Sequence, residues 1–163
     1  MKHPSVILII ILAFSFSGCN DDSLPGIYVN SKYGNDSNRG TLRKPVRTIQ
    51  EVNRRIKDKP SDIFFAGGQE FEGTLILESI RIEDTIPLSV TSYGEGRATI
   101  KGGNEESIRM NKCKNIRIKD LDLKGNGRKE GNTTNGLWLI NCEECVIDDI
   151  YAEGFQKSGV DLY

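Results

Sequence analysis

An internal repeat near the C-terminal end constrains the fold of this chain more than any other feature of its sequence. The stretch 116–125 (IRIKDLDLKG) aligns with 145–154 (CVIDDIYAEG) at a spacing of 29 residues. The stretch 159–163 (GVDLY) then aligns with 136–140 (GLWLI) at a spacing of 23, and an extra loop within 125–135 accounts for the six-residue difference. A period of 20–50 residues is typical of proteins built from stacked repeats.

Each repeat contains three short stretches in which apolar residues alternate with polar ones, as in strands with one buried face. This pattern predicts an all-β chain folded as coils of a parallel β-helix, in which each coil pairs with the next at about 4.8 Å. Equivalent residues then lie in columns. The predicted inward columns are Ile108/Leu137/Val160, Met110/Leu139/Leu162, Ile116/Cys145, Ile118/Ile147, Leu121/Ile150 and Leu123/Ala152.

One amphipathic helix precedes the strands. Thr48 is placed to cap its N-terminus, and Glu51 stands three residues later, at the spacing of a capping box. Ile49, Val52 and Ile56 fall on one helical face. The helix is expected to end by Pro60, and further strands are predicted at 63–66, 74–77, 88–92 and 98–101.

The N-terminus resembles a bacterial lipoprotein export signal. Lys2 and His3 precede an uncharged apolar run at 6–16, which is too short to span a membrane and has the length of a signal-peptide core. Phe-Ser-Gly-Cys at 16–19 resembles a lipobox, and the acidic residues after it resemble those of Bacteroides-type surface lipoproteins. We therefore expect a signal peptide at 1–18, lipid on Cys19, a polar tether at 19–26 and one domain at 27–163, anchored in the cell envelope at the outer membrane or cell surface.

The charged residues exclude several functions. Removing residues 1–18 takes away Lys2, which leaves 21 Lys and Arg (22 minus one) against 23 Asp and Glu. Nucleic acid is therefore not an expected partner. The single histidine, His3, lies in the signal, so the processed chain has no histidine for a Ser-His-Asp triad or a metal site.

Three cysteines remain after Cys19. Cys142 and Cys145 have a Cys-x-x-Cys spacing, but zinc needs a second pair of ligands and a redox site needs a helix N-terminus. Cys113 stacks over Cys142 at the repeat spacing, which favours apolar core residues. A Cys113–Cys142 disulfide is the alternative in an oxidising compartment.

The chain from 27 to 163 resembles right-handed parallel β-helix proteins of the pectin-lyase-like superfamily. The segments that carry the resemblance are 27–29 (IYV), 34–41 (GNDSNRGT), 44–45 (KP), 48–50 (TIQ), 62–65 (DIFF), 73–75 (GTL) and 92–94 (SYG). The resemblance implies the N-terminal coils of such a helix, closed by an N-terminal capping α-helix. Members include polysaccharide lyases, which use Ca2+ and a Lys or Arg base, glycoside hydrolases and non-catalytic surface proteins. No stretch matches a catalytic motif of the family, so the catalytic residues stay unassigned.

Outward positions supply the candidate site residues. Arg109, Trp138 and Asp161 fall in one column, where an indole could stack on a sugar while the charged groups bind hydroxyls or a uronate. The alternative is that Trp138 packs under the loop 125–135. Asp120 over Asp149 forms a carboxylate pair that could hold Ca2+, or else a solvated turn ladder beside Lys119.

Two further patterns are weaker. Asp122, Asp148 and Asp161 could in principle supply a hydrolase acid and base. The segment 36–40 has half the pattern of a calcium loop, and a turn is the favoured interpretation.

The chain ends within a predicted strand, so we expect these residues to be part of a longer β-helix protein. The first hypothesis is a cell-envelope lipoprotein from a polysaccharide-processing protein, either a lyase or a glycoside hydrolase, acting on acidic or neutral polysaccharide. The alternatives are a non-catalytic glycan-binding or adhesive lipoprotein, or an inactive remnant. We expect the 163 residues alone to be inactive.

Overall fold

The computed structural model describes residues 24–163. The predicted signal peptide, Cys19 and most of the tether therefore lie outside the described residues. Within residues 24–163, no helix is long and apolar enough to span a membrane.

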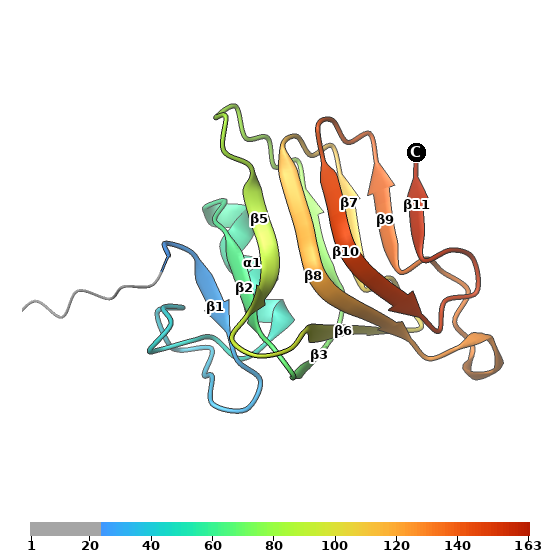
Figure 1. Ribbon diagram of the computed structural model, residues 1–163, viewed down its shortest axis with the longest axis horizontal. Helices are drawn as coiled ribbons and strands as arrows, with labels where there is room; N and C mark the ends of the chain where they lie inside the picture. The colour runs from blue at the N-terminus through green and yellow to red at the C-terminus, as the bar shows by residue number, and fades with distance from the viewer. Residues whose placement is uncertain (1–23) are drawn as a thin grey trace, which may run out of the picture.

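Short strands form most of the regular structure, as Figure 1 shows. In chain order the elements are β1 (Ile27–Val29), α1 (Ile49–Asp58), β2 (Ile63–Ala66), β3 (Glu70–Glu72), β4 (Leu75–Glu78), β5 (Leu88–Tyr93), β6 (Ala98–Gly103), β7 (Ile108–Asn111), β8 (Ile116–Gly125), the 3-10 helix η1 (Arg128–Glu130), β9 (Leu137–Ile140), β10 (Val146–Glu153) and β11 (Val160–Leu162).

The strands form two sheets, and every strand pair within them is parallel. One sheet has the order β1-β2-β5-β8-β6-β3 with β10 beside β8, and the other has the order β11-β9-β7-β4. Strand β8 pairs with β5 through its first half and with β6 through its second half. The chain thus passes through β2, β3 and β4, returns to lie beside β2 as β5, and repeats the path (Figure 1). These all-parallel sheets are compatible with the predicted β-helix.

The strand register follows the sequence repeat. Ile147 of β10 lies beside Ile118 of β8, 29 positions earlier. Val160 of β11 lies beside Leu137 of β9, 23 positions earlier. The loop that contains η1 accounts for the difference. The repeat in the sequence therefore predicts the register residue by residue for the strand pairs β7–β9, β8–β10 and β9–β11.

The predicted strands are present with small shifts at their ends. The strand predicted at 63–66 is β2 unchanged, and the one predicted at 74–77 is β4 displaced by one residue. Strand β3 was not predicted, because it has one apolar residue, Phe71, between two glutamates and is too short to show an alternating pattern.

The predicted inward columns form the core on the earlier passes. Ile108, Ile118 and Leu123 are fully buried, and each such side chain stabilises the fold by roughly 1.5–3 kcal/mol. The last pass departs from the prediction: Val160 is 39% exposed and Leu162 is 68% exposed. Both lie on β11, which is the edge strand of its sheet, so no strand covers them in the described chain.

Helix α1 packs against β1 and β4 through its apolar face. Ile49, Val52 and Ile56 are at most 1% exposed, as the spacing predicts. The Thr48 hydroxyl accepts a hydrogen bond from the N–H of Glu51 at 3.2 Å and so caps the helix. The helix ends at Asp58, and Lys59 is its C-cap, so the predicted stop before Pro60 is confirmed.

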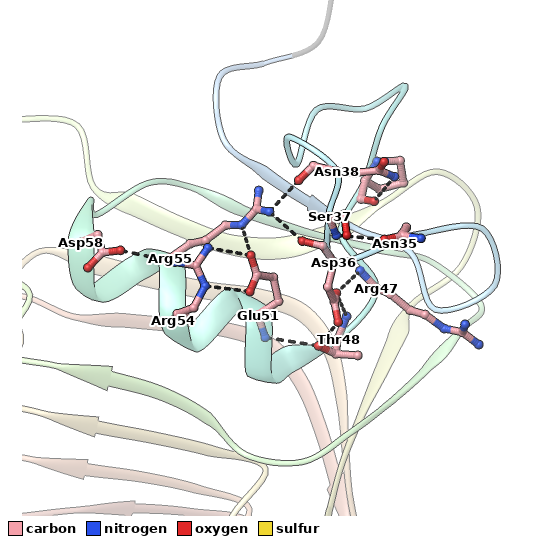
Figure 2. A network of polar contacts seen from close by, with 11 residues as sticks. Asn35, Asp36, Ser37, Asn38, Arg47, Thr48, Glu51, Arg54, Arg55 and Asp58 are labelled. Carbon is pink, nitrogen blue, oxygen red and sulfur yellow. Dashed lines mark hydrogen bonds and ion pairs between the residues drawn. The ribbon is translucent and has the colours of Figure 1, made fainter.

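Half of the predicted capping box is absent. Glu51 does not reach back to the Thr48 backbone in the structure; instead its carboxylate accepts hydrogen bonds from Arg54 at 2.8 Å and from Arg55 at 2.6 Å (Figure 2). The hydrogen bond from Arg54, supported by Arg55, lowers the pKa of Glu51 to about 2. The Thr48 N–H donates to the carboxylate of Asp36 at 3.0 Å.

Asp36 fixes the loop before the helix. Its carboxylate also accepts hydrogen bonds from the Arg47 N–H and the Thr48 hydroxyl, both at 2.8 Å. Arg55 donates to the carbonyls of Asp36 and Asn38, so helix and loop are held from two sides (Figure 2). The segment 36–40 is therefore a structural turn, as the favoured interpretation predicts.

Left-handed backbone conformations also repeat at the spacing of 29. Lys112 has a φ of 54° and Asn141 a φ of 51°. A non-glycine residue in this region is uncommon, and its recurrence at equivalent places marks the corners of the repeat. Two further pairs with positive φ are Asn115/Glu144 and Asp120/Asp149.

The three described cysteines are free thiols, and the alternative Cys113–Cys142 disulfide is not formed. Cys113 is fully buried, and its thiol donates to the carbonyl of Leu77 at 3.3 Å. Burial raises the pKa of Cys113 to about 11 and raises the pKa of Cys145 as well. Both therefore stay protonated at neutral pH. Cys113 belongs to the core, and the partly buried Cys145 packs against it.

Candidate carbohydrate-binding site

The predicted column of outward residues lies on the smaller sheet. Arg109 of β7 is the register partner of Trp138 of β9, and Trp138 is the register partner of Asp161 of β11. Ile76 of β4 continues the column beyond Arg109. Because strands alternate their side chains between two faces, all these side chains stand on the outer face, opposite the buried Ile108 and Leu137.

Two residues that the sequence prediction missed lie beside this column. Glu106 comes two residues before β7 and Asn135 two residues before β9, so both stand at the edge of the sheet where these strands begin. Glu106 is 6% exposed and Asn135 is 4% exposed. They are separated by the same 29 residues as the strands that follow them, and this spacing is the signal that could have identified them.

Polar contacts join these residues to the column. The Asn135 side-chain amide donates to a carboxylate oxygen of Asp161 at 3.0 Å. A guanidinium nitrogen of Arg109 lies 4.0 Å from a carboxylate oxygen of Glu106. The site therefore combines two carboxylates, one guanidinium and one primary amide around the indole, and all can bind hydroxyl groups.

The side chain of a buried asparagine holds the loop before β9 in place. Asn132 is fully buried, and its side-chain amide donates to the carbonyl of Gly103 at 2.9 Å. Its side-chain oxygen accepts from the N–H groups of Thr134 and Gln156. Asn132 thus ties together three successive loops at this edge of the sheet and positions Asn135.

Trp138 is half-buried and packs edge to face with Tyr163, with ring centroids 6.4 Å apart. Its indole nitrogen Nε1 is buried without a hydrogen-bond partner, and so is the side-chain oxygen Oδ1 of Asn135. Buried polar atoms of this kind are rare in folded proteins, so the site holds an unused donor and an unused acceptor.

The predicted carboxylate pair, Asp120 and Asp149, lies elsewhere, on β8 and β10 of the larger sheet. Asp149 forms a close ion pair with Arg97, which lowers the pKa of Asp149, and Asp120 lies 3.8 Å from Lys119. Arg97 also reaches Asp122 at 3.5 Å. The two carboxylates of the pair are therefore neutralised by side chains of the protein, Asp149 by Arg97 and Asp120 by Lys119. Among residues 24–163, no group of three or more His, Cys, Asp or Glu side chains is placed to hold a metal ion.

No protein-family model matches the sequence, and no curated protein is detectably similar to it. Among solved structures, GH136 lacto-N-biosidase from Eubacterium ramulus shares the fold. Its selenomethionine derivative matches 84% of this chain with a TM-score of 0.60 and 18% identity, and the native protein matches 75% with a TM-score of 0.52 and 16% identity. The matches cover only 29% and 30% of those chains, so this chain spans less than a third of its neighbours' length. At such identity the likeness is one of fold.

Proposed function

We propose that residues 27–163 are the first coils of a right-handed parallel β-helix that α1 closes at its N-terminal end. The repeated path through β2–β4 and β5–β7 supports this proposal, because each pass pairs in parallel with the next. The buried columns at a spacing of 29 support it independently, because a solenoid stacks equivalent residues.

This β-helix belongs to a carbohydrate-active protein, and glycoside hydrolysis fits it better than elimination by a lyase. The observation that carries the proposal is the column of Arg109, Trp138 and Asp161 on one outer face, where an aromatic ring lies between groups that bind hydroxyls. The fold that it shares with a lacto-N-biosidase favours the hydrolase class. A glycan-binding lipoprotein without turnover is the second candidate, because the column needs no catalysis to bind sugar.

The products formed distinguish these candidates. The processed protein in detergent is mixed with lacto-N-biose-containing oligosaccharides and, separately, with polygalacturonate and Ca2+. New reducing ends without an unsaturated uronate support a hydrolase, and new reducing ends together with an unsaturated uronate support a lyase. Retention without product supports a binding module, or coils that bind sugar without the catalytic residues of a longer protein. The Trp138→Ala variant tests the column. It should weaken retention of the oligosaccharide about tenfold or more, because the area on which a sugar ring stacks is lost. Equal retention by this variant would remove the column from the proposal.

Export and lipid attachment at Cys19 complete the proposed function and rest on the sequence. In cells fed labelled palmitate, the wild-type protein should carry label and sediment with the envelope. A Cys19→Ser variant should lose both the label and the membrane association, because several acyl chains on one residue are needed for stable anchoring. Label that persists in the variant would contradict the assignment of Cys19.

A further inference from the structure

Among residues 24–163, three buried side-chain polar atoms lack a hydrogen-bond partner, and two of them lie at the proposed site. They are the indole Nε1 of Trp138 and the amide oxygen Oδ1 of Asn135; the third is Nε of Arg117 on β8. Nε1 is only a donor and Oδ1 only an acceptor, so the two offer opposite halves of a hydrogen-bonding surface. A group that both donates and accepts would satisfy them.

The two side chains are held next to each other through Asp161. Asn135 donates to the carboxylate of Asp161 at 3.0 Å, and Asp161 is the register partner of Trp138. The amide of Asn135 is used on its nitrogen and unused on its oxygen. A buried amide oxygen without a partner is uncommon, and a bound molecule with a donor group would satisfy it.

Access to these atoms requires a neighbouring side chain to move, since both atoms are enclosed. Arg109 is the other register neighbour of Trp138, and its side chain is 40% exposed. Its ion pair with Glu106 spans 4.0 Å, which is long for a charge-assisted contact. The Arg109 side chain, next to Trp138 in the register, is therefore only weakly held and can move when a ligand binds.

The charge of the site limits the kind of sugar. Glu106 and Asp161 are carboxylates and Arg109 is the only cation among the site residues, so the formal charge is −1, from one positive and two negative groups. A polyuronate brings one carboxylate per ring into this field, and like charges in a partly buried site repel each other. A neutral sugar brings hydroxyl groups without that penalty.

We propose that this site binds a neutral sugar ring, whose hydroxyl groups accept a hydrogen bond from Trp138 Nε1 and donate one to Asn135 Oδ1. This inference rests on the proposed carbohydrate function and names the class of ligand for it. The same charges disfavour uronate-containing chains, which a lyase would require.

Trp138 is the only tryptophan of the chain, so its fluorescence reports on this site alone. The processed protein is titrated with lacto-N-biose and with digalacturonate, and affinities are measured by calorimetry for wild type and for Trp138→Phe. This substitution removes Nε1 and keeps an aromatic ring. Tyr151→Phe is the matched control, because it removes one polar group from an exposed ring on β10 of the other sheet. Thermal unfolding establishes that each variant is folded.

We expect lacto-N-biose to change the fluorescence and digalacturonate to leave it unchanged at the same concentration. Trp138→Phe should bind lacto-N-biose about tenfold more weakly, the effect of one lost hydrogen bond to a buried group, whereas Tyr151→Phe should bind as wild type does. Deoxy analogues of lacto-N-biose, each lacking one hydroxyl group, provide a second measurement. The analogue that lacks the hydroxyl bound by Trp138 Nε1 should bind weakly to the wild-type protein, and Trp138→Phe should not weaken its binding further.

Three results overturn the inference, and each has a different meaning for the proposed function. If Trp138→Phe binds as tightly as wild type, a resident water satisfies the two atoms, and the carbohydrate function stands. If digalacturonate binds more tightly than lacto-N-biose, the ligand class is wrong and a lyase is favoured. If neither sugar changes the fluorescence or releases heat, both the inference and the proposed site fail.

Discussion

Single side chains determine how this fold responds to acid, and Glu51 is the clearest case. Its pKa is about 2 in the folded protein against an ordinary value of 4.5, because Arg54 and Arg55 hold it ionised. A lowered pKa means that the stabilisation is fully present above about pH 4.5 and is lost as the pH falls towards 2.

Glu51→Gln should therefore lower the free energy of unfolding at pH 7 and change it little at pH 2.5. We expect a loss of about 1–2 kcal/mol at neutral pH, allowing for the 62% exposure of the Arg54 side chain. Urea unfolding measured across this range checks the prediction, with the exposed Glu95→Gln as control. If the free energy of unfolding of Glu51→Gln depends on pH as that of the wild-type protein does, the prediction is contradicted.

The corners of the repeat impose another constraint on single residues. Lys112 is exposed and has a left-handed backbone, which costs a non-glycine residue about 1–2 kcal/mol. Lys112→Gly should raise the free energy of unfolding by about 0.5–1 kcal/mol, while Lys112→Val should lower it by at least as much. Thr99→Gly within β6 is the matched control and should destabilise by about 0.5–1 kcal/mol. A higher melting temperature for Lys112→Val than for Lys112→Gly would refute this account.

At the scale of elements, α1 closes one end of the core. Ile56 is 1% exposed on the buried face of the helix, whereas the adjacent Lys57 is exposed. Ile56→Ala should lower the free energy of unfolding by roughly 2–5 kcal/mol, and Lys57→Ala should change it by less than about 0.5 kcal/mol. Denaturant unfolding checks both values. Equal effects at the two positions would mean that α1 does not cover the core.

The hydrogen bonds of Asp36 hold the N-terminal end of helix α1 against the preceding loop. They fix Thr48, whose hydroxyl in turn accepts a hydrogen bond from the Glu51 N–H in the first turn, where backbone N–H groups lack partners within the helix. The capping signal in the sequence identified Thr48 correctly. It did not identify Asp36, because twelve residues separate Asp36 from Thr48 and no local spacing rule joins them.

For the molecule as a whole, the two ends of the stacked strands differ. At the other end from α1, Leu162 is 68% exposed and Tyr163 is 78% exposed, beside the free edge of β11 (Figure 1). An exposed edge strand with apolar side chains favours pairing with another chain.

The described residues by themselves should therefore associate as their concentration rises. Leu162→Lys should reduce this association, because a charge on an edge strand opposes pairing. Ile86→Lys, at a residue that is 74% exposed in a loop, should leave it unchanged. Sedimentation velocity over a range of concentrations measures the difference. A monomer at all concentrations would show that the edge is protected.

The amino-acid sequence was enough to predict the register of the strand pairs β7–β9, β8–β10 and β9–β11, the core columns of the earlier passes, the capped helix and the column of Arg109, Trp138 and Asp161. It could do so because stacked coils repeat: a spacing of 29 in the chain becomes one strand spacing in the fold, so periodicity alone assigns residues to columns. The contacts of each side chain became visible in the folded chain alone. Arg97 pairs with Asp149, one of the two carboxylates for which the sequence offered a metal ion, and also reaches Asp122, while Asn135 turns one half of its amide to Asp161 and leaves the other half unused. These contacts depend on the paths of loops that differ from one coil to the next, and a repeat carries no information about them.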